Sequence, residues 1–547
     1  VTDYLRHGRV PPSRELRDDF EAASGALAYL LDLAPGAQAE IDILVPLHAG
    51  APIPREARDE DGRAWVAARF EETRSAWEAA AGRVVLEAPP AASVAIESLR
   101  SQLGFVLVNR AGPAIQPGVR SYARSWIRDG ALTSSALLRL GHPEPVKEFL
   151  LWYAPHQYAN GKAPCVVDAR GADPVPEHDS SGEFIFLVAE YYRYTRDAAI
   201  LDAMLPRVLR AAAYLDSLRQ ERLTPEYAAG ERREFYGILP PSISHEGYSA
   251  KPMHSYWDDF WALRGFRDAA YLARTGGRAE DAARLAAVHD AFARDLAASI
   301  AAAMERHGID YVPGCADLGD FDATSTTIAL SPAAAQELLP PGALERTFEK
   351  YYGFFRDRRD GAPWEAFTPY EIRNIGAFVR LGWRDRAQEL LDYFLAAQTP
   401  PGWRQWPEVV WSDTRTPRFV GDLPHGWVGS DYMRSLLDMF AYVDEPAEAL
   451  VIGAGLPPAW LEPAPGVVVR HLPTPYGPLG YSMVRRGDTI ELRIEDEGMK
   501  LPAGGILVRA PLGGRSAAAS IDGRPAEVSA QGDFVVREIP ALLIIRP

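Results

Sequence analysis

Cysteine is nearly absent from this chain, which has two, Cys165 and Cys315, among 547 residues. They lie in different segments and lack the spacing of metal-binding motifs, so the sequence predicts neither a zinc site nor a disulfide framework. We expect two buried thiols, with one long-range disulfide as the alternative. No metal and no organic cofactor is expected.

Long apolar runs and positive charge are lacking as well. No window approaches the roughly 18 uncharged apolar residues of a membrane span. The formal net charge is −16, which argues against a nucleic-acid partner. Val1 is not followed by a basic segment and an apolar run, so we find no signal peptide and leave a bacterial cytoplasmic or a periplasmic or secreted location open. Lysine is rare among many arginines, which we interpret as a bacterial coding bias; the five lysines are at 147, 162, 251, 350 and 500.

The remaining composition, 47% hydrophobic and 24% charged, is that of a globular protein of several structural units. In residues 1–58, the stretch 24–50 alternates and breaks at Pro-Gly, which predicts a hairpin of a β-sandwich with earlier strands before Val1. Residues 59–90 are expected to form a linker with an amphipathic helix at 59–82.

Apolar residues recur at helical spacing between residues 91 and 462, in a loosely repeated helical hairpin of roughly fifty residues. A full set would contain about twelve helices. Residues 463–547 return to short alternating runs, which predict a C-terminal β-sandwich. Residues 321–327 are expected to form a turn. The predicted helices are 92–110, 130–155, 180–196, 198–220, 255–275, 278–306, 331–355, 370–398 and 426–442.

One helix start carries more large side chains than a cap requires. In "YARSWIRDG", Asp129 alone could cap the following helix, yet Tyr122, Trp126 and Arg128 precede it. Three other long connections, 237–261, 360–371 and 402–427, are also rich in aromatic and acidic residues. Their candidates are Glu246, His254, Tyr256, Trp257 and Asp258, then Trp364 and Glu365, then Trp403, Trp406, Glu408, Trp411, His425 and Trp427. "PEHDSSGEF" adds His178 and Asp179.

Tryptophans beside carboxylates in several loops indicate a sugar ligand. Pyranose rings present apolar faces to indole, while their hydroxyls bind carboxylates and arginine. Cleavage of a glycosidic bond needs two carboxyl groups, one protonated as the acid and one ionised as the base or nucleophile. No phosphate-binding loop, metalloprotease or serine-hydrolase motif competes with this interpretation.

The stretch "YARSWIRDGALTSSALL" resembles the Tyr-x-x-x-Trp-x-Arg-Asp motif of glucoamylase-type enzymes. These are six-hairpin glycosidases, a group that also includes trehalases and α-L-rhamnosidases. The resemblance covers about 90–450 and implies a mainly α fold, an α/α toroid catalytic domain at 91–462 flanked by N-terminal and C-terminal β-sandwich elements. It also implies that Arg128 and Asp129 bind sugar hydroxyls in subsite −1, with Tyr122 and Trp126 lining the pocket.

By position, the resemblance makes Glu246 the general acid and Glu408 the general base of an inverting glycoside hydrolase that acts at a chain end. The carboxyls of an inverting pair should lie about 6.5–9.5 Å apart. The family's Trp-Glu-Glu at the acid is replaced here by Ser244-His245-Glu246-Gly247, so Asp258 is the rival acid. The expected substrate-binding set is Tyr122, Trp126, Arg128, Asp129, His178, Asp179, Trp257, Asp258, Trp364, Glu365, Trp406, His425 and Trp427.

Each candidate also has a structural interpretation. Asp129 and Asp179 could be helix caps, Glu246 a solvated loop residue, and Trp364-Glu365 a core residue and a cap. Two other functions compete with hydrolysis: a phosphorylase of the same fold, and a sugar-binding protein without activity. The sequence identifies neither the sugar, its linkage and anomer, nor the oligomeric state.

Overall fold

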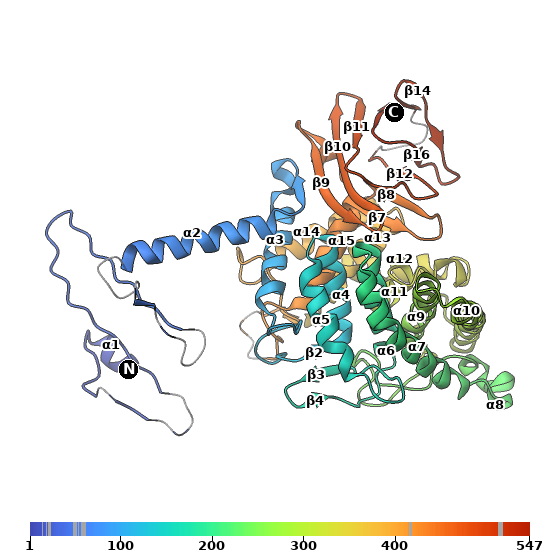
Figure 1. The fold of residues 1–547 in the computed structure, drawn as a ribbon, viewed down its shortest axis with the longest axis horizontal. Coiled ribbons are helices and arrows are strands. Elements are labelled where there is room, and N and C mark those ends of the chain that lie inside the picture. Colours follow the sequence, from blue (N-terminus) through green and yellow to red (C-terminus); the bar gives the residue numbers. More distant parts are fainter. Residues whose placement is uncertain are drawn as a thin grey trace. The chain divides into compact units, whose positions relative to one another are not determined.

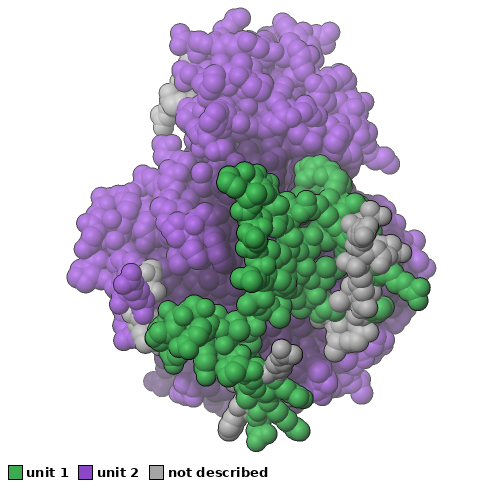
Figure 2. Space-filling view, turned by 90° about the vertical axis from the view of Figure 1, so that its left-hand side faces the viewer, with its two compact units in different colours: residues 1–79 green, residues 80–547 purple. Residues whose placement is uncertain are grey.

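The computed structural model describes residues 1–547 except 14, 18, 20–22, 47–51, 53, 56–61, 414, 416, 417, 512–517 and 547. The chain divides into two compact units, residues 1–79 and residues 80–547, which Figure 2 colours separately. The second unit contains all the residues considered as a site.

The first unit contains helix α1 (Thr2–Arg6) and most of helix α2 (Gly62–Ala81), which lies where a helix was predicted. The expected hairpin is not formed, because described residues 23–46 contain a turn at Pro35 and Gly36 but no strand. A two-stranded hairpin is marginal without a third strand or an apolar surface to cover it. Consistent with this, the side chains of Leu27, Leu30 and Val45 are exposed. The predicted residues 47–50 lie outside the described part.

Six helices of the second unit form a closed ring, in which each packs against the next and the last against the first. Figure 1 labels all six. In order these are α4 (Ile127–Arg139), α6 (Asp179–Thr195), α9 (Tyr256–Thr275), α11 (Ala323–Leu330), α13 (Arg373–Arg380) and α15 (Gly426–Phe440). Six outer helices alternate with them along the chain: α3 (Ser93–Val108), α5 (Pro143–Tyr153), α7 (Ala198–Gln220), α10 (Ala279–His307), α12 (Ala343–Arg359) and α14 (Arg384–Ala396). The described residues thus form the predicted six-hairpin α/α toroid.

The boundaries differ from the prediction in four places. The helix predicted at 331–355 begins only at Ala343, as α12, because Pro340, Pro341 and Gly342 directly precede it. The segment 130–155 is two helices, α4 and α5, because Gly141 and Pro143 interrupt it. The segment 370–398 is likewise two helices, α13 and α14, separated at Gly382, whose φ is +77°. The turn expected at 321–327 is the start of α11, which Asp322 caps by accepting the backbone N–H of Ser325 at 2.9 Å.

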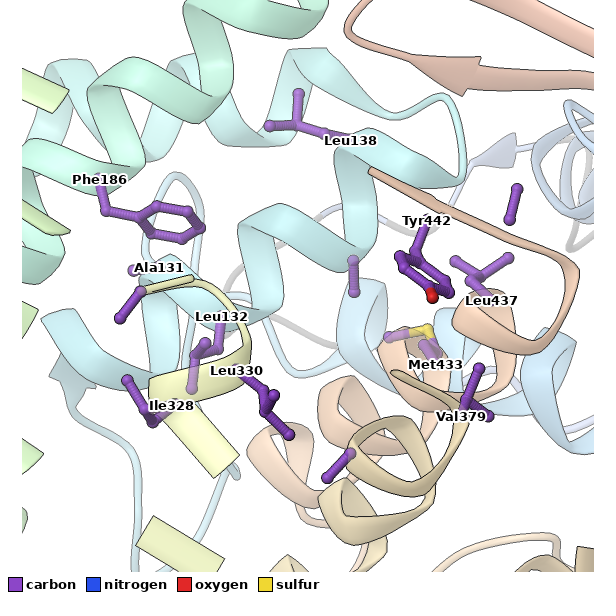
Figure 3. Packing of buried hydrophobic residues seen from close by; sticks show 14 of the residues in the cluster. Ala131, Leu132, Leu138, Phe186, Ile328, Leu330, Val379, Met433, Leu437 and Tyr442 are labelled. Atoms are coloured by element: carbon purple, nitrogen blue, oxygen red, sulfur yellow. The ribbon is translucent and has the colours of Figure 1, made fainter. Parts of the chain in front are cut away.

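The inner helices are buried on nearly all sides, as helices enclosed by others must be. Figure 3 shows Leu132, Ile328, Val379 and Met433, from four inner helices, in the core that they share. Helices α6 and α9 approach so closely that a Cβ on Gly182 would lie 2.2 Å from the carbonyl oxygen of Trp261. Glycine is therefore required at this crossing.

Two sheets follow the toroid. One has the order β1 (Val85–Glu87), β9 (Val467–Thr474), β10 (Gly477–Arg486), β11 (Thr489–Glu495), β17 (Ala541–Arg546), β13 (Ala518–Ile521) and β14 (Arg524–Pro525). The other has the order β15 (Glu527–Val528), β16 (Phe534–Val536), β12 (Ile506–Val508), β8 (Ala449–Ile452) and β7 (Ala441–Asp444). Alternate residues of β11 and β17 are buried, as predicted for a sheet with one covered face. The strands begin at Ala441, earlier than expected, and β1 joins them from before the toroid.

Short elements complete the fold. Three strands pair as β2 (Ser125–Trp126), β3 (Val166–Asp168) and β4 (Gly171–Ala172), and two pair as β5 (Ala366–Phe367) and β6 (Val410–Trp411). The short helices are η2 (Pro90–Ala92), η3 (Ala154–His156), α8 (Pro225–Ala228), η4 (Gly230–Phe235), η5 (Gln336–Leu338), η6 (Pro369–Ile372) and η7 (Pro458–Leu461).

Among the described residues, the segment Pro90–Val108 is the one helix whose length and hydropathy would suffice to cross a membrane. A core helix of a globular domain passes the same test. The buried side chains of Leu99, Leu103 and Val106 lie in the core, and α3 packs against α15. Its apolar composition is therefore explained by its place in the toroid.

Arginines connect the carboxyl ends of the inner helices to strand β7. Arg139 donates to Asp438 at 2.7 Å and to the carbonyl of Ala441 at 2.8 Å, and Arg380 donates to the other oxygen of Asp438 at 2.8 Å. A cavity of about 770 Å³ lies at this end, lined by these three side chains and by β7. The β-structure thus covers the carboxyl ends of the ring.

We predict that Gly182→Ala lowers the melting temperature, because the added methyl group overpacks the contact of α6 with α9 at a cost of about 1–3 kcal/mol. Gly353→Ala is the matched control, since Gly353 is helical, exposed and has open space where a Cβ would lie. That control should melt at or slightly above the wild-type temperature. Calorimetry measures the melting temperature of each variant. Equal values for Gly182→Ala and Gly353→Ala would contradict the close packing of α6 against α9.

Candidate active site

The amino ends of the inner helices meet at the end of the ring opposite β7. Arg128 and Asp129 lie in the first turn of α4, Asp179 begins α6, and Arg373 begins α13. Trp427 lies in the first turn of α15. Six parallel helices bring residues far apart in sequence to one place, where the positive ends of their dipoles favour carboxylates.

Arg128 is the buried cation of this cluster. Its guanidinium donates to Glu177 at 2.7 Å and lies 3.8 Å from both Asp129 and Asp179. It also lies over the ring of Trp427, 4.8 Å from the centroid. One guanidinium therefore faces three carboxyl groups, and burial raises the pKa of Glu177 to about 8 despite the opposing effect of Arg128.

Asp129 is buried but caps nothing. Residue Trp126 is the N-cap of α4, and no side chain there bonds the helix N–H groups. Burial raises the pKa of Asp129 to about 7; Arg128 lowers it, while the charges of Glu246 and Glu408 raise it. Within the described part of the chain no hydrogen bond to its carboxyl is found, so the cap interpretation of Asp129 does not hold.

Two tyrosines hold Glu408. Tyr122 donates its hydroxyl to Oε2, and Tyr370 donates to Oε1 at 3.1 Å. Burial raises the pKa of Glu408, the two hydroxyls lower it, and the charge of Glu246 raises it again. Gly421, with φ +70°, lies so close that a Cβ there would be 2.6 Å from the Cβ of Glu408.

A carboxylate joins the two loops that carry Tyr122 and Glu408. Asp422 accepts the backbone N–H groups of Arg120, Ser121 and Tyr122 at 2.8, 2.8 and 3.0 Å. Burial raises the pKa of Asp422, but these bonds outweigh it and keep the pKa below its usual range. Residues about 300 positions apart are thereby fixed side by side.

Glu246 is exposed, and its Oε1 accepts the indole N–H of Trp126 at 3.1 Å. The Trp126 ring meets that of Tyr122 edge to face, with 5.6 Å between the centroids. Because Tyr122 also donates to Glu408, one pair of aromatic rings links the two catalytic candidates.

Asp258, the rival acid, lies beneath the segment that carries Glu246. It is 1% exposed, and its two oxygens accept the hydroxyls of Ser242 and Ser244. Burial and the charge of Asp179 raise its pKa. Because its side chain is almost fully buried beneath this segment, Asp258 has no open path to a glycosidic oxygen, and the geometry favours the exposed Glu246.

Three further candidates are brought to the cluster. Trp257 donates to Asp179 at 2.8 Å, so that carboxyl is a partner of an indole and not a helix cap. His425 is the N-cap of α15, and burial lowers its pKa to about 3, which makes it a neutral imidazole. Trp427 lies 4.4 Å from the ring centroid of Tyr370 and faces both Arg128 and Arg373.

Four candidates are not brought together with these. Trp406 is buried against Tyr432 and donates to the carbonyl of Phe394 at 2.7 Å, which makes it a core residue. Glu365 is exposed and paired with Arg418, and its neighbour Trp364 packs on Phe367. For His178, burial lowers the pKa to about 4, and its strongest electrostatic neighbours are Lys162 and Arg222.

Sequence reasoning missed several members of the cluster. Glu177 directly precedes the candidates His178 and Asp179, and Tyr370 stands in the same loop as Trp364, so proximity in the chain could have pointed to both. Arg373 pairs with Asp431 at 2.7 Å, but no sequence feature connects those two residues.

The described residues contain no group of three His, Cys, Asp or Glu side chains that could hold a metal ion. Cys165 and Cys315 are buried and free, as expected, and burial raises the pKa of both thiols.

The cavity of about 770 Å³ lies at the other end of the ring and not at this cluster. Four arginines of its lining are paired: Arg139 and Arg380 share Asp438, while Arg193 and Arg264 share Asp268. These ion pairs stabilise a junction of helices and strands. The candidate carboxyls Glu246 and Glu408 lie instead in the loops that precede α9 and α15.

The fold is shared with α-L-rhamnosidases. The structure from Dictyoglumus thermophilum aligns with a TM-score of 0.53 at 12% identity, over 85% of this chain and 50% of that one. The Streptomyces avermitilis enzyme complexed with L-rhamnose gives 0.53 at 14%, over 85% and 42%. The GH78 family rhamnosidase of Bacillus sp. GL1 gives 0.54 at 14%, over 78% and 43%.

This chain spans half the length of those proteins or less, and at such identities the comparison shows the fold alone. That fold is the α/α toroid with β-domains, which is the fold that the resemblance to glucoamylase-type enzymes implied. No protein-family model and no curated protein matches the chain.

The raised pKa of Asp129 predicts a pH-dependent cost of folding. Its pKa is about 7 in the folded protein and about 4 in an unfolded chain. The folded state therefore binds the proton more tightly, and stability from this group falls as pH rises from about 4 to about 7, by at most about 1.4 kcal/mol per unit.

Asp129→Asn should remove this cost, so its melting temperature relative to wild type should be higher at pH 8 than at pH 5. Asp202→Asn, at an exposed position on α7, is the control and should show the same difference at both pH values. If the melting-temperature difference between Asp129→Asn and wild type did not change with pH, the raised pKa of the buried Asp129 carboxyl would be contradicted.

Proposed function

We propose that this protein is an inverting glycoside hydrolase with Glu246 as the general acid and Glu408 as the general base. The observation that carries the proposal is the pair of carboxyls itself. Glu246 accepts the indole N–H of Trp126, and Glu408 accepts the hydroxyls of two tyrosines. The negative charge of each raises the pKa of Asp129. Cleavage of a glycosidic bond uses two carboxyl groups, and aromatic side chains beside them can stack on the sugar rings.

In the proposed reaction, Glu246 gives its proton to the glycosidic oxygen while the bond from that oxygen to the anomeric carbon breaks. Glu408 takes a proton from water, whose oxygen forms the new bond on the opposite face. The sugar is released with inverted configuration, and the two carboxyls exchange protons with solvent to complete the cycle. Inversion requires a carboxyl separation of about 6.5–9.5 Å, which stays a prediction.

The charges of the cluster favour a neutral sugar. Both guanidinium groups are already bound to carboxyls, Arg128 to Glu177 and Arg373 to Asp431. Among the described residues of the cluster, a uronic acid would therefore find no free guanidinium group, and it would face Glu246 and Glu408. The Arg128 and Asp129 pair is proposed to bind hydroxyls of the sugar, and α-L-rhamnosides are among the neutral glycosides to test. Action at a chain end remains part of the proposal.

The pairing of both arginines with carboxyls also argues against a phosphorylase. Phosphate would need cationic partners, and the arginines of the cluster are committed to carboxyls. Glu408, which accepts two tyrosine hydroxyls, is proposed to act on water. Turnover that is independent of inorganic phosphate is the expected result.

Leaving-group dependence should separate the two glutamates. Glu246→Gln should lose roughly 10²–10⁴-fold activity on natural oligosaccharides but keep much of it on aryl glycosides with an acidic phenol, which needs no protonation. Glu408→Gln should be inactive on both, because every substrate requires the base.

Glu527→Gln, at an exposed glutamate paired with Arg537 in the C-terminal sheet, is the control and should retain wild-type activity. Full activity of Glu246→Gln on oligosaccharides would remove it as the acid. Sugar binding without turnover by the wild type, across a panel of neutral glycosides, would favour a binding protein.

The hydroxyl of Tyr122 should set the acidic limb of the pH profile. The base must be ionised, so activity falls as pH drops through the pKa of Glu408. Tyr122 lowers that pKa, and Tyr122→Phe should therefore shift the acidic limb of kcat/KM to higher pH, by about one unit for a bond to a charged group. Tyr352→Phe, whose hydroxyl bonds Glu389, should leave the profile unchanged. A shift to lower pH would contradict the assignment of Glu408.

A further inference from the structure

Glu246 lies in the segment 242–253, whose backbone conformation is strained at two residues. The segment is closed where Ser242 and Met253 exchange backbone hydrogen bonds of 3.0 Å, before α9 begins. Within it, Ser244 and Glu246 have φ values of +54° and +67°, in the left-handed region. Non-glycine residues held in this region cost of order 1–3 kcal/mol each and persist only where surrounding contacts fix them.

The first turn of α9 supplies those contacts. Asp258 accepts the hydroxyl of Ser242 on Oδ2 and that of Ser244 on Oδ1, the latter at 2.7 Å. The backbone N–H of Ser244 donates to the Ser242 hydroxyl at 2.7 Å, which closes a small network around one carboxyl. Ser255, at the helix start, lies 3.0 Å from the same Ser244 oxygen.

The residue between Ser244 and Glu246 is fastened as well. His245 stacks on Trp257 with 4.9 Å between ring centroids, and its nitrogens lie 3.0 Å from the Ser244 hydroxyl and 3.1 Å from that of Ser325. Ser244 and His245 are thus anchored directly before Glu246, and Tyr248, two residues after it, donates its hydroxyl to Asp320 at 3.0 Å. Beyond them, the exposed Glu246 side chain has the Trp126 indole as its hydrogen-bond partner in the described part of the chain.

We propose that Asp258 is a positioning residue, which orients the general acid Glu246 through the hydroxyls of Ser242 and Ser244. The proposal rests on the role of Glu246 given above. Asp258 itself touches no substrate, because its side chain is 1% exposed and lies below the segment, where it accepts the two serine hydroxyls. Its effect on the reaction passes through the direction of the Glu246 side chain, while Glu408 is held by separate contacts.

This division predicts a particular pattern of loss. Ser244→Ala removes the hydroxyl between Asp258 and the segment, and Asp258→Asn replaces one acceptor with a donor. Both variants should lose at least roughly tenfold more kcat/KM on oligosaccharides than on aryl glycosides with an acidic phenol, the signature of a misplaced acid. Ser435→Ala is the control, since this buried serine on α15 donates its hydroxyl to the backbone carbonyl of Ile372, and its losses should be equal on both substrates.

A double variant gives the decisive comparison. If Asp258 acts through Glu246, then adding Ser244→Ala to Glu246→Gln should change kcat/KM less than twofold, whereas independent effects would multiply. Equal losses on both substrate types, or multiplied losses in the double variant, would overturn the positioning role. Ser244→Ala serves if Asp258→Asn does not fold. Failure of the proposed function is distinguishable, because Glu246→Gln alone would then show no dependence on the leaving group.

Discussion

The ion pairing of Arg128 is the interaction on which the site depends. Its buried guanidinium faces Glu177, Asp129 and Asp179 and lies over Trp427, so one cation serves three carboxyls drawn from α4, α6 and the residues before α6. Burial lowers the pKa of Arg128, but these carboxyls outweigh it and raise the pKa. Carboxyls buried in such numbers without a cation would be costly, and the helix dipoles alone would not offset them.

Because the six inner helices are parallel, the two ends of the toroid differ in charge. At the carboxyl ends, arginines such as Arg139 and Arg380 neutralise the helix dipoles and bind strand β7, so charges are paired and the end is covered. At the amino ends, carboxyls exceed cations and loops carry Glu246 and Glu408 outward. The charged residues that stabilise the fold and the proposed catalytic carboxyls thus lie at opposite ends of the helices.

The toroid was predictable because helical spacing and hairpin repetition are properties of local sequence. The YARSWIRDG stretch likewise pointed to Arg128 and Asp129, and aromatic neighbours to Glu408. What sequence could not supply is the direction of a side chain. Trp406 flanks Glu408 by only two positions yet packs on Tyr432, whereas Tyr370, 38 positions away, binds it. The N-terminal hairpin failed for a related reason, since alternation specifies a strand only where another surface covers it.

The most direct test of the account is a crystal structure of the Glu246→Gln, Glu408→Gln double variant with a bound neutral oligosaccharide. The account predicts that the sugar lies at the amino ends of the inner helices, with Arg128 and Asp129 on its hydroxyls. The glycosidic oxygen should lie within hydrogen-bond distance of residue 246, and a water should lie between residue 408 and the anomeric carbon. A sugar bound instead in the arginine-lined cavity beside β7, or with its glycosidic oxygen remote from residue 246, would contradict the account.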